Sequence, residues 1–362
     1  KPANIGILFS RQKGMVVKMA YQKSSAAYDE LESDKERRRA LFFSKFVGYI
    51  PLIGLAAIIG LYFISLAVTG YRFSIQLEVI VNNIILVAFV ATGASFIFAI
   101  GSFDLSLGAN MLLCAIVGSL VYTRTGSLIL MIAVCVALAT AISLVNYLLA
   151  SVFNLPVFIM TVAMMTVLST ISNFIVGRNT IYLKFSNSSN PDKEIYTNVL
   201  DTVWFRFVLL GVYVLVCCFI FYFTKIGREQ KFLGGNPVCA KLSGISSVKL
   251  AFISFTMAGI GIGLAAFCAT LPTESVTSST GSSVGMNMLI AIVFGGMALS
   301  GGPKAKAFAA FIGGCTMAFL DEFMYNVLMY AGIGSSSDYI SMIVKAVLFL
   351  IVAFLLGMAT RP

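Results

Sequence analysis

The chain is dominated by apolar stretches that are each long enough to cross a lipid bilayer. Hydrophobic residues make up 59% of its 362 residues and charged residues only 11%, whereas soluble domains carry about 25% charged residues. A spanning helix needs about 20 apolar residues, and lipid cannot hydrogen-bond exposed peptide groups, so the spans must be helical. The sequence therefore predicts an all-α polytopic membrane protein.

About ten of these stretches have the length of a transmembrane helix. The second is long enough to tilt or to break, and the eighth is short for a full crossing. We therefore expect a bundle of about ten membrane helices that includes broken or half-length members. The ten ranges are 46–68, 75–101, 107–123, 128–150, 157–177, 203–224, 249–270, 288–300, 306–325 and 340–357.

Lysine and arginine indicate the orientation, because cytoplasmic loops near transmembrane ends carry an excess of both. With the N-terminus in the cytoplasm, the tail at 1–45 and the loop at 225–249 both lie inside, and together they hold most of the 25 basic residues. An even number of spans returns the C-terminus to the cytoplasm. We expect a cytoplasmic tail over 1–45 and one transmembrane domain over 46–362.

The net charge of +10 is then a signal of membrane orientation, and we expect no nucleic-acid partner. Arg37, Arg38 and Arg39 directly precede the first span. At that position they either anchor the topology or hold anionic lipid headgroups. Anchoring of the topology is the favoured explanation, and membrane lipid is among the expected partners of the chain.

The chain lacks the groups that most catalytic and metal sites need. It has no histidine and seven cysteines, and all but one of these cysteines lie in predicted spans, where a reduced thiol packs as a small apolar group. No Cys/His metal spacing exists and no Ser-His pair is possible. A Gly-rich lysine loop for ATP phosphates is also missing. We expect a non-enzymatic chain without metal or cofactor, and this leaves transport as its function.

The loop at 225–249 is the most polar and basic segment in the second half of the chain. Within it, Asn236 has the character of a helix N-cap and Pro237 that of a first helical residue, while Gly244 lies just past the end. The pattern predicts a short, exposed helix over 237–243 at the membrane surface. Such a helix on the cytoplasmic side is suited to contact a soluble partner.

Polar residues interrupt several spans, and intramembrane polar groups often line a substrate path. Each also has a structural explanation: Asp104 has the context of a helix N-cap, and Lys345 is expected to pair with an acid or to extend its amine to the interface. The candidate path residues are Asn82, Asn83, Ser95, Asp104, Ser106 and Ser300.

A weak internal repeat is visible. Gly101–Gly108 and Gly295–Gly302 each contain a Leu-Ser-x-Gly turn between a descending and an ascending span. Six spans separate the two copies, so both point the same way. This indicates parallel repeats about an axis along the membrane normal, a common plan in transporters.

Several motifs together resemble the membrane permeases of ribose-type ABC importers. They occur in the family's order between about residues 70 and 360. The matching segments are Tyr71–Asn83 with "RFLT…NLLN", Gly101–Gly108 with "GGIDLSVG", Leu155–Thr161 with "LPPFIATLG", Gly227–Ile245 with "GR…GGN…AARLSGI" and Phe294–Gly302 with "IGGTSLSGG". The sequence departs from the pattern at Ser102, Ala163, Cys239, Lys304 and Lys306.

This resemblance implies a bacterial cell-membrane protein in which two permease copies, or this chain and a paralogue, form a pore. Two ABC ATPase subunits would drive it, and an extracytoplasmic substrate-binding protein would deliver a sugar. The helix over 237–243 would be the coupling helix, in which Gly234 and Gly235 permit the turn and Asn236 caps. Ala240 and Leu242 would pack on the ATPase. The full coupling set is Arg228, Gly234, Gly235, Asn236, Pro237, Ala240, Lys241, Leu242 and Gly244.

Other functions remain open. A permease of the same superfamily could carry nucleosides, an autoinducer or branched-chain amino acids. An ion-coupled secondary transporter would need a cluster of charges at mid-membrane, whereas here the charges are sparse and lie near span ends. A purely structural or receptor-like subunit would not need the repeated polar breaks.

Overall fold

The computed structural model describes residues 34–177, 179–183, 185, 202–280, 284–297, 301–302, 305–333 and 337–360. The chain divides into two compact units, Lys1–Ile50 and Pro51–Pro362, and all contacts below lie within the second. The helices are α2 (Asp34–Thr69), α3 (Phe73–Ala99), α4 (Leu107–Thr125), α5 (Leu128–Val152), α6 (Val157–Val176), α8 (Val203–Phe223), α9 (Lys225–Gly235), α10 (Pro237–Leu242), α11 (Ser247–Thr270), α12 (Val284–Phe294), α13 (Ala307–Tyr330) and α14 (Ser337–Thr360).

The predicted all-α membrane fold is confirmed. Within the described part of the chain, seven helices are long and apolar enough to cross a membrane. The predicted eighth span is indeed short, since α12 has 11 residues, whereas α3 runs through 27 residues without a break. Helix α13 has the length for a crossing, with 24 residues, but it carries Asp321 and Glu322. The total of ten stays a prediction.

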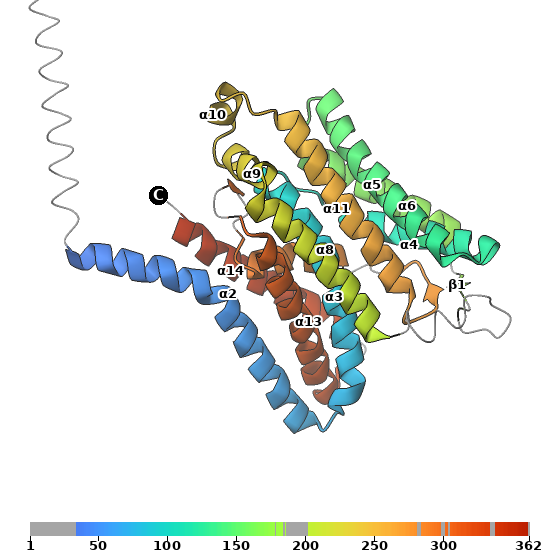
Figure 1. Ribbon diagram of the computed structural model, residues 1–362. Helices are drawn as coiled ribbons and strands as arrows, with labels where there is room; N and C mark the ends of the chain where they lie inside the picture. The colour runs from blue at the N-terminus through green and yellow to red at the C-terminus, as the bar shows by residue number, and fades with distance from the viewer. Residues whose placement is uncertain are drawn as a thin grey trace, which may run out of the picture. The chain divides into compact units, whose positions relative to one another are not determined.

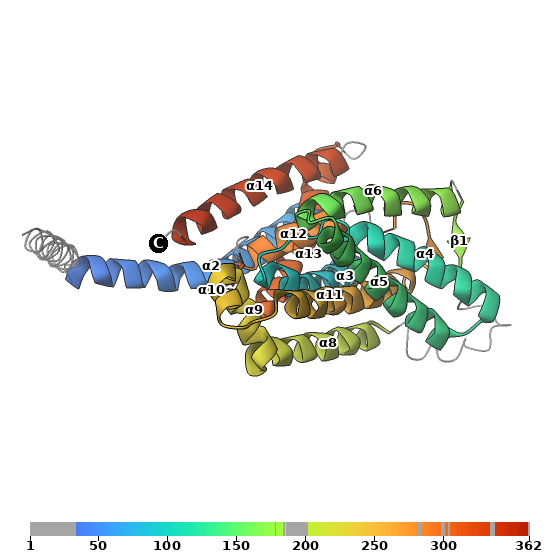
Figure 2. The same ribbon diagram turned by 90° about the horizontal axis from the view of Figure 1, so that it is seen from above.

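Helices α3 and α11 form the centre of the bundle. Helix α11 lies between α3 and α5, and α3 also packs against α8, α12 and α13; Figure 2 shows α3 and α11 side by side. The main hydrophobic core includes Phe89 and Phe96 of α3 and Ile262 and Phe267 of α11. Because both helices are enclosed by others, their apolar residues run around the whole circumference and not along a single stripe.

Glycines on α11 allow this close packing. A Cβ atom added to Gly259 would lie 3.0 Å from the backbone nitrogen of Thr140, and one added to Gly263 would lie 2.8 Å from the carbonyl oxygen of Cys135, both on α5. On the opposite face, a Cβ at Gly261 would lie 2.6 Å from the carbonyl oxygen of Phe89 on α3. Small residues at such spacings are how membrane helices bring their backbones together.

A second glycine contact joins α12 and α13. A Cβ at Gly313 would overlap the carbonyl oxygen of Ala291, and a Cβ at Gly295 would overlap that of Ala309. Gly313 of α13 therefore lies against the backbone of α12, and Gly295, which directly follows α12, lies against the backbone of α13. Helix α13 also approaches α3, where Gly314 lies against Ala88.

A buried polar network ties α2 to α3 and α13. The hydroxyl of Tyr62 donates to Oε1 of Gln76 at 3.0 Å, and Nδ2 of Asn326 donates to Oγ of Ser65 at 3.3 Å. Nδ2 of Asn326 also donates to Oε1 of Gln76 at 3.2 Å.

At one end of the bundle (Figure 1), strand β1 (Ile181–Tyr182) pairs antiparallel with β2 (Ser275–Val276).

Replacing Gly263 by valine is expected to lower the apparent melting temperature of the detergent-solubilised protein. The added side chain has no room against α5, and overpacking a tight contact costs about 1–3 kcal/mol. The control is Gly211→Ala, because nothing lies within 4 Å of a Cβ at that helical position. An equal effect of both variants on the melting temperature would contradict the assigned packing.

Candidate functional site

The loop between α8 and α11 folds into two helices. Asn236 separates α9 from α10, and its Oδ1 accepts a hydrogen bond from the backbone nitrogen of Cys239 at 3.0 Å. Pro237 occupies the first turn of α10, and Gly244, with φ of +75°, follows the helix end. The predicted short, N-capped helix is confirmed, and it ends at Leu242, one residue before the predicted end.

Most of α10 is exposed. Leu242 exposes 83% and Val238 69% of its surface, so two large apolar side chains lack cover on a helix that lies at the end of the bundle (Figure 1). Ala240 is fully buried and packs with Leu233 and Leu250. The expectation that Ala240 packs on a partner is therefore wrong, because one side of this amphipathic turn already faces the bundle. Leu242 remains available, and Val238 joins it.

Helix α9 was not predicted, and it attaches α10 to the bundle. Nε2 of Gln230 donates to Oγ of Ser254 on α11 at 2.9 Å, and Gln230 is fully buried. The Nζ atom of Lys231 lies 4.6 Å from the ring centre of Phe221, a cation–π distance. Arg228 is exposed. Helix α9 has no continuous apolar stripe that would predict it from the sequence, because only a few side chains on one of its faces are buried.

The C-terminal end of α9 contacts the last residue of α3 and the second repeat turn, and the two repeat turns contact each other. A Cβ at Gly234 would overlap the carbonyl oxygen of Ala99 and lie 2.8 Å from the backbone nitrogen of Gly302. A Cβ at Gly301 would lie 3.0 Å from the backbone nitrogen of Gly101. We call this meeting of Ala99–Gly101, Gly234–Gly235 and Gly301–Gly302 the glycine junction.

The glycine junction corrects one prediction. Gly234 and Gly235 were expected to permit a turn, but they form the end of α9, and neither is among the glycines with positive φ. Gly101, Gly301 and Gly302 do have positive φ, between +67° and +81°. The glycines of α9 are thus needed for close backbone approach, and those of the repeat turns for chain reversal.

The turn between α3 and α4 holds two predicted site residues together. Oδ1 of Asp104 accepts hydrogen bonds from the backbone nitrogen and from Oγ of Ser106, each at 2.7 Å. Nδ2 of Asn146 on α5 donates to Oγ of Ser106 at 2.7 Å. The N-cap position of α4 belongs to Ser106, so Asp104 orders the turn without capping the helix. Burial raises the pKa of Asp104, and the hydrogen bonds from Ser106 and Asn146 lower it in part.

The other predicted path residues lie apart. Asn82 on α3 accepts a hydrogen bond from Arg206 of α8, and buried Ser95 donates to the carbonyl oxygen of Thr92 at 2.6 Å. Asn83 is partly exposed on the same helix, and Ser300 lies outside the described residues. That these side chains line a path remains a prediction.

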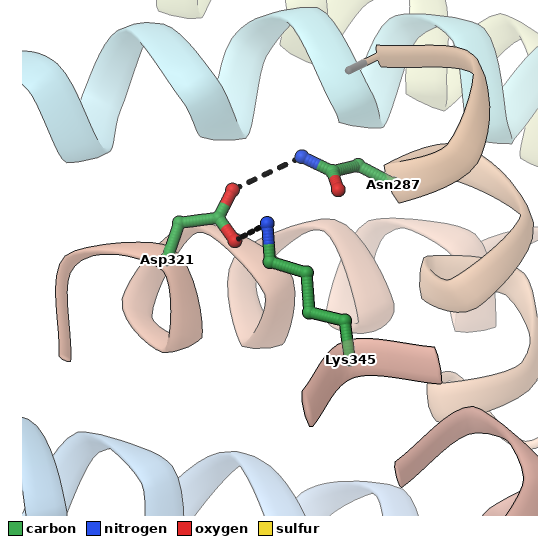
Figure 3. A network of polar contacts seen from close by, with 3 residues as sticks. All are labelled: Asn287, Asp321 and Lys345. Carbon is green, nitrogen blue, oxygen red and sulfur yellow. Dashed lines mark hydrogen bonds and ion pairs between the residues drawn. The ribbon is translucent and has the colours of Figure 1, made fainter. Parts of the chain in front are cut away.

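Sequence reasoning missed Arg206 and left open which acid pairs with Lys345. Arg206 is 1% exposed, although a lone charge three residues inside an apolar stretch was a visible signal. Asp321 pairs with Lys345 at 2.5 Å and accepts a hydrogen bond from Nδ2 of Asn287 at 3.0 Å (Figure 3). The expected pairing of Lys345 with an acid is confirmed, but these charges lie inside α13 and α14 and not near span ends.

A bundle of apolar helices with a capped, exposed helix at its end defines a multi-pass membrane protein. Residues 76–353 match the family described as "Branched-chain amino acid transport system / permease component", and the chain belongs to this family. The resemblance drawn from the motifs is thereby confirmed.

Several curated relatives are sugar permeases. The ribose import permease protein RbsC of Escherichia coli K12 is 27% identical over 269 residues, which cover 73% of this chain and 80% of that protein. RbsC of Haemophilus influenzae is 26% identical, covering 73% and 79%. The L-arabinose ABC transporter permease protein AraH of Azospirillum brasilense is 23% identical, covering 66% and 69%. No solved structure matches the chain significantly.

Replacing Asp104 by alanine is expected to lower the melting temperature of the purified protein, because two hydrogen bonds from Ser106 lose their acceptor. Leaving buried donors without a partner costs about 1–3 kcal/mol. Asp104→Asn retains Oδ1 as an acceptor and serves as the control, with a smaller loss. A loss as large in the asparagine variant would show that the carboxylate charge, and not the acceptor, stabilises the turn.

Proposed function

We propose that this chain is the permease subunit of an ATP-driven ABC importer that moves a monosaccharide across a bacterial cell membrane. The curated relatives named for ribose, arabinose and fructose favour a sugar, although the family description names branched-chain amino acids. Nucleosides and autoinducers are the remaining alternatives within this class. The chain itself would hydrolyse no ATP, since it has no phosphate-binding lysine loop.

The single observation that carries this proposal is the exposed α10. Its Val238 and Leu242 expose most of their surface, and exposed apolar groups on a capped helix outside the bundle fit a groove on a soluble partner. Lys241 lies between them and is also exposed, where it would affect the rate of association more than the affinity. The partner is an ABC ATPase subunit.

Through the glycine junction, movement of α10 would be transmitted to the rest of the bundle. Movement of α10 would displace α9, because the single residue Asn236 joins the two helices and leaves little slack between them. The end of α9 contacts the turns at Ala99–Gly101 and Gly301–Gly302 directly through backbone atoms. Backbone contacts without intervening side chains transmit displacement with little compression. ATP-driven movement of α10 would thus shift the ends of α3 and α12, a rigid-body switch.

The remaining assembly follows from the orientation. The N- and C-termini, α10 and the glycine junction would lie on the cytoplasmic side, where lysine and arginine gather. A substrate-binding protein would deliver the sugar from the other side. A second copy of the permease, or a paralogue, would complete the pore, and lipid would surround it.

An ion-coupled secondary transporter is the second candidate. The pairing of Asp321 with Lys345 at 2.5 Å favours it, since intramembrane carboxylates occur in ion-coupled carriers. Purified protein in liposomes separates the two. Transport that needs a co-purified ATPase and ATP supports the importer, and transport by the chain alone under an ion gradient supports the carrier.

Asn236→Ala is expected to remove the cap of α10 and about 1 kcal/mol of helix stability. Sugar-stimulated ATPase activity of the assembled complex should fall, while Asn236→Ser, which retains a capping oxygen, should preserve it. If the alanine variant keeps both its activity and its recovery of ATPase in a pull-down, α10 is not the coupling helix.

Gly234→Ala is expected to uncouple ATP hydrolysis from uptake. The methyl group would overlap the carbonyl oxygen of Ala99, so the glycine junction must separate while α10 stays intact. The complex should still bind its ATPase but should move fewer sugar molecules per ATP in proteoliposomes. Gly211→Ala, which meets nothing within 4 Å, is the control. An unchanged ratio in the Gly234 variant would rule out this route.

A further inference from the structure

A cavity of about 840 Å³ lies between α12, α13 and α14. Its wall is largely apolar, with contributions from Met286, Leu289 and Phe349. Six polar side chains interrupt this wall, and they come from all three helices: Asn287, Asp321, Glu322, Tyr325, Ser341 and Lys345. A mostly apolar pocket with a few convergent polar groups is the usual form of a small-molecule site.

Three of these polar groups are already connected. Nζ of Lys345 lies 2.5 Å from Oδ1 of Asp321, and Nδ2 of Asn287 lies 3.0 Å from Oδ2 of the same carboxylate. Figure 3 shows the amide and the amine approaching Asp321 from two other helices. The side chains of Lys345 and Asp321 are 13% and 19% exposed. A buried ion pair contributes little net stability, so packing alone does not account for it.

Glu322 is the informative member. It is 8% exposed and lines the cavity, yet no described residue forms a hydrogen bond or an ion pair with its carboxyl group. Its carboxyl oxygens are not among the fully buried polar atoms that lack a partner, so they face the space of the cavity, where a bound molecule can donate hydrogen bonds to them. Glu322 therefore offers an acceptor to a ligand in the cavity.

The hydrogen-bond donors and acceptors that line the cavity indicate the class of ligand. The Asp321–Lys345 pair is neutral as a whole, which leaves Glu322 as the one charge of the described lining without a counter-charge. Relatives named for ribose, arabinose and fructose favour a sugar over a cation at this carboxylate. An anion would be repelled by Asp321 and Glu322 together. A neutral polyhydroxyl compound suits both kinds of group, because each hydroxyl donates to a carboxylate and accepts from an amine or amide. The exposed ring of Tyr325 adds an apolar face with a polar tip.

We propose that this cavity binds the solute during translocation, and that the solute is a neutral sugar held by Glu322, Asn287 and the Asp321–Lys345 pair. The inference rests on the proposed function. It locates the path between α12, α13 and α14, away from the α3 residues Asn82, Asn83 and Ser95. The volume of the cavity admits a monosaccharide with water.

The first test uses the complex purified with its ATPase and binding protein, reconstituted in proteoliposomes with radiolabelled ribose, arabinose or fructose. Glu322→Gln is expected to lower uptake about tenfold or more, because hydrogen bonds to a charged acceptor are lost. Its melting temperature should be unchanged or higher, because among the described residues no side chain pairs with this carboxyl group and the substitution breaks no contact within the protein. Glu78→Gln, at an exposed carboxylate of α3, is the control and should keep full uptake.

A double variant separates binding from structural support. Asp321→Asn with Lys345→Met removes both charges of the pair, so that neither partner is left charged without the other. If the pair only joins α13 to α14, this variant should retain uptake as well as folding. If the pair holds the sugar, the variant should fold, retain ATPase activity in the absence of sugar, and lose uptake.

Thiol labelling tests whether water and sugar reach the cavity. In a Cys239→Ser background, Ser341→Cys should react with a charged, membrane-impermeant thiosulfonate, and the transported sugar should slow the reaction. The control is Val347→Cys, which is exposed on α14 but does not line the cavity. It should stay unreactive, because a thiol in lipid does not ionise.

The outcomes distinguish failure of the proposed function from failure of the proposed sugar site. If the wild-type complex moves none of the three sugars with ATP, the proposed function fails and this site with it. If the wild-type complex moves a sugar while Glu322→Gln and the double variant match its uptake, the site alone is wrong. Labelling of Ser341→Cys that no transported sugar slows also overturns the site.

Discussion

Contact between helix backbones through glycine is the constraint on which the rest of the structure depends. In lipid no hydrophobic force draws helices together, so association relies on packing and on interhelical hydrogen bonds. Gly259 and Gly263 bring α11 onto α5, and Gly261 brings it onto α3. Gly295 and Gly313 join α12 to α13 in the same way. These contacts fix the positions of α3, α12 and α13, and through them the two places where function is proposed.

The glycine junction applies this constraint to movement. Its three segments are far apart in sequence, yet Gly234, Gly301 and Ala99 meet without side chains between them. A stiff contact of this kind is what the proposed transmission of movement from an ATPase subunit would need. The cavity between α12, α13 and α14 borders α12, and Gly301 of the junction follows the end of α12 by seven residues in the sequence. The proposed coupling helix and the proposed sugar site are therefore close to the same stretch of the chain.

Local signals in the sequence predicted the parts of the site that depend on local structure. The cap by Asn236, the proline after it and Gly244 lie within nine residues, and α10 forms as predicted. Helix α9 escaped prediction because Gln230 and Gly227 are buried only by contact with α11 and α8. The inward position of Ala240 escaped for the same reason, since its neighbour Leu250 belongs to α11.

The sequence by itself determined the class of fold, because apolar length and the absence of hydrogen-bonding partners in lipid allow only helices. It also determined the family, through motifs that occur in order along the chain. Only the tertiary structure decided which polar groups meet: Asn82 with Arg206, Asp321 with Lys345 and Asn326 with Gln76. Each partner lies on another helix, and the choice among many helices depends on how the glycines let the backbones pack. The positions of polar residues along the sequence do not show which helix will supply the partner of each one.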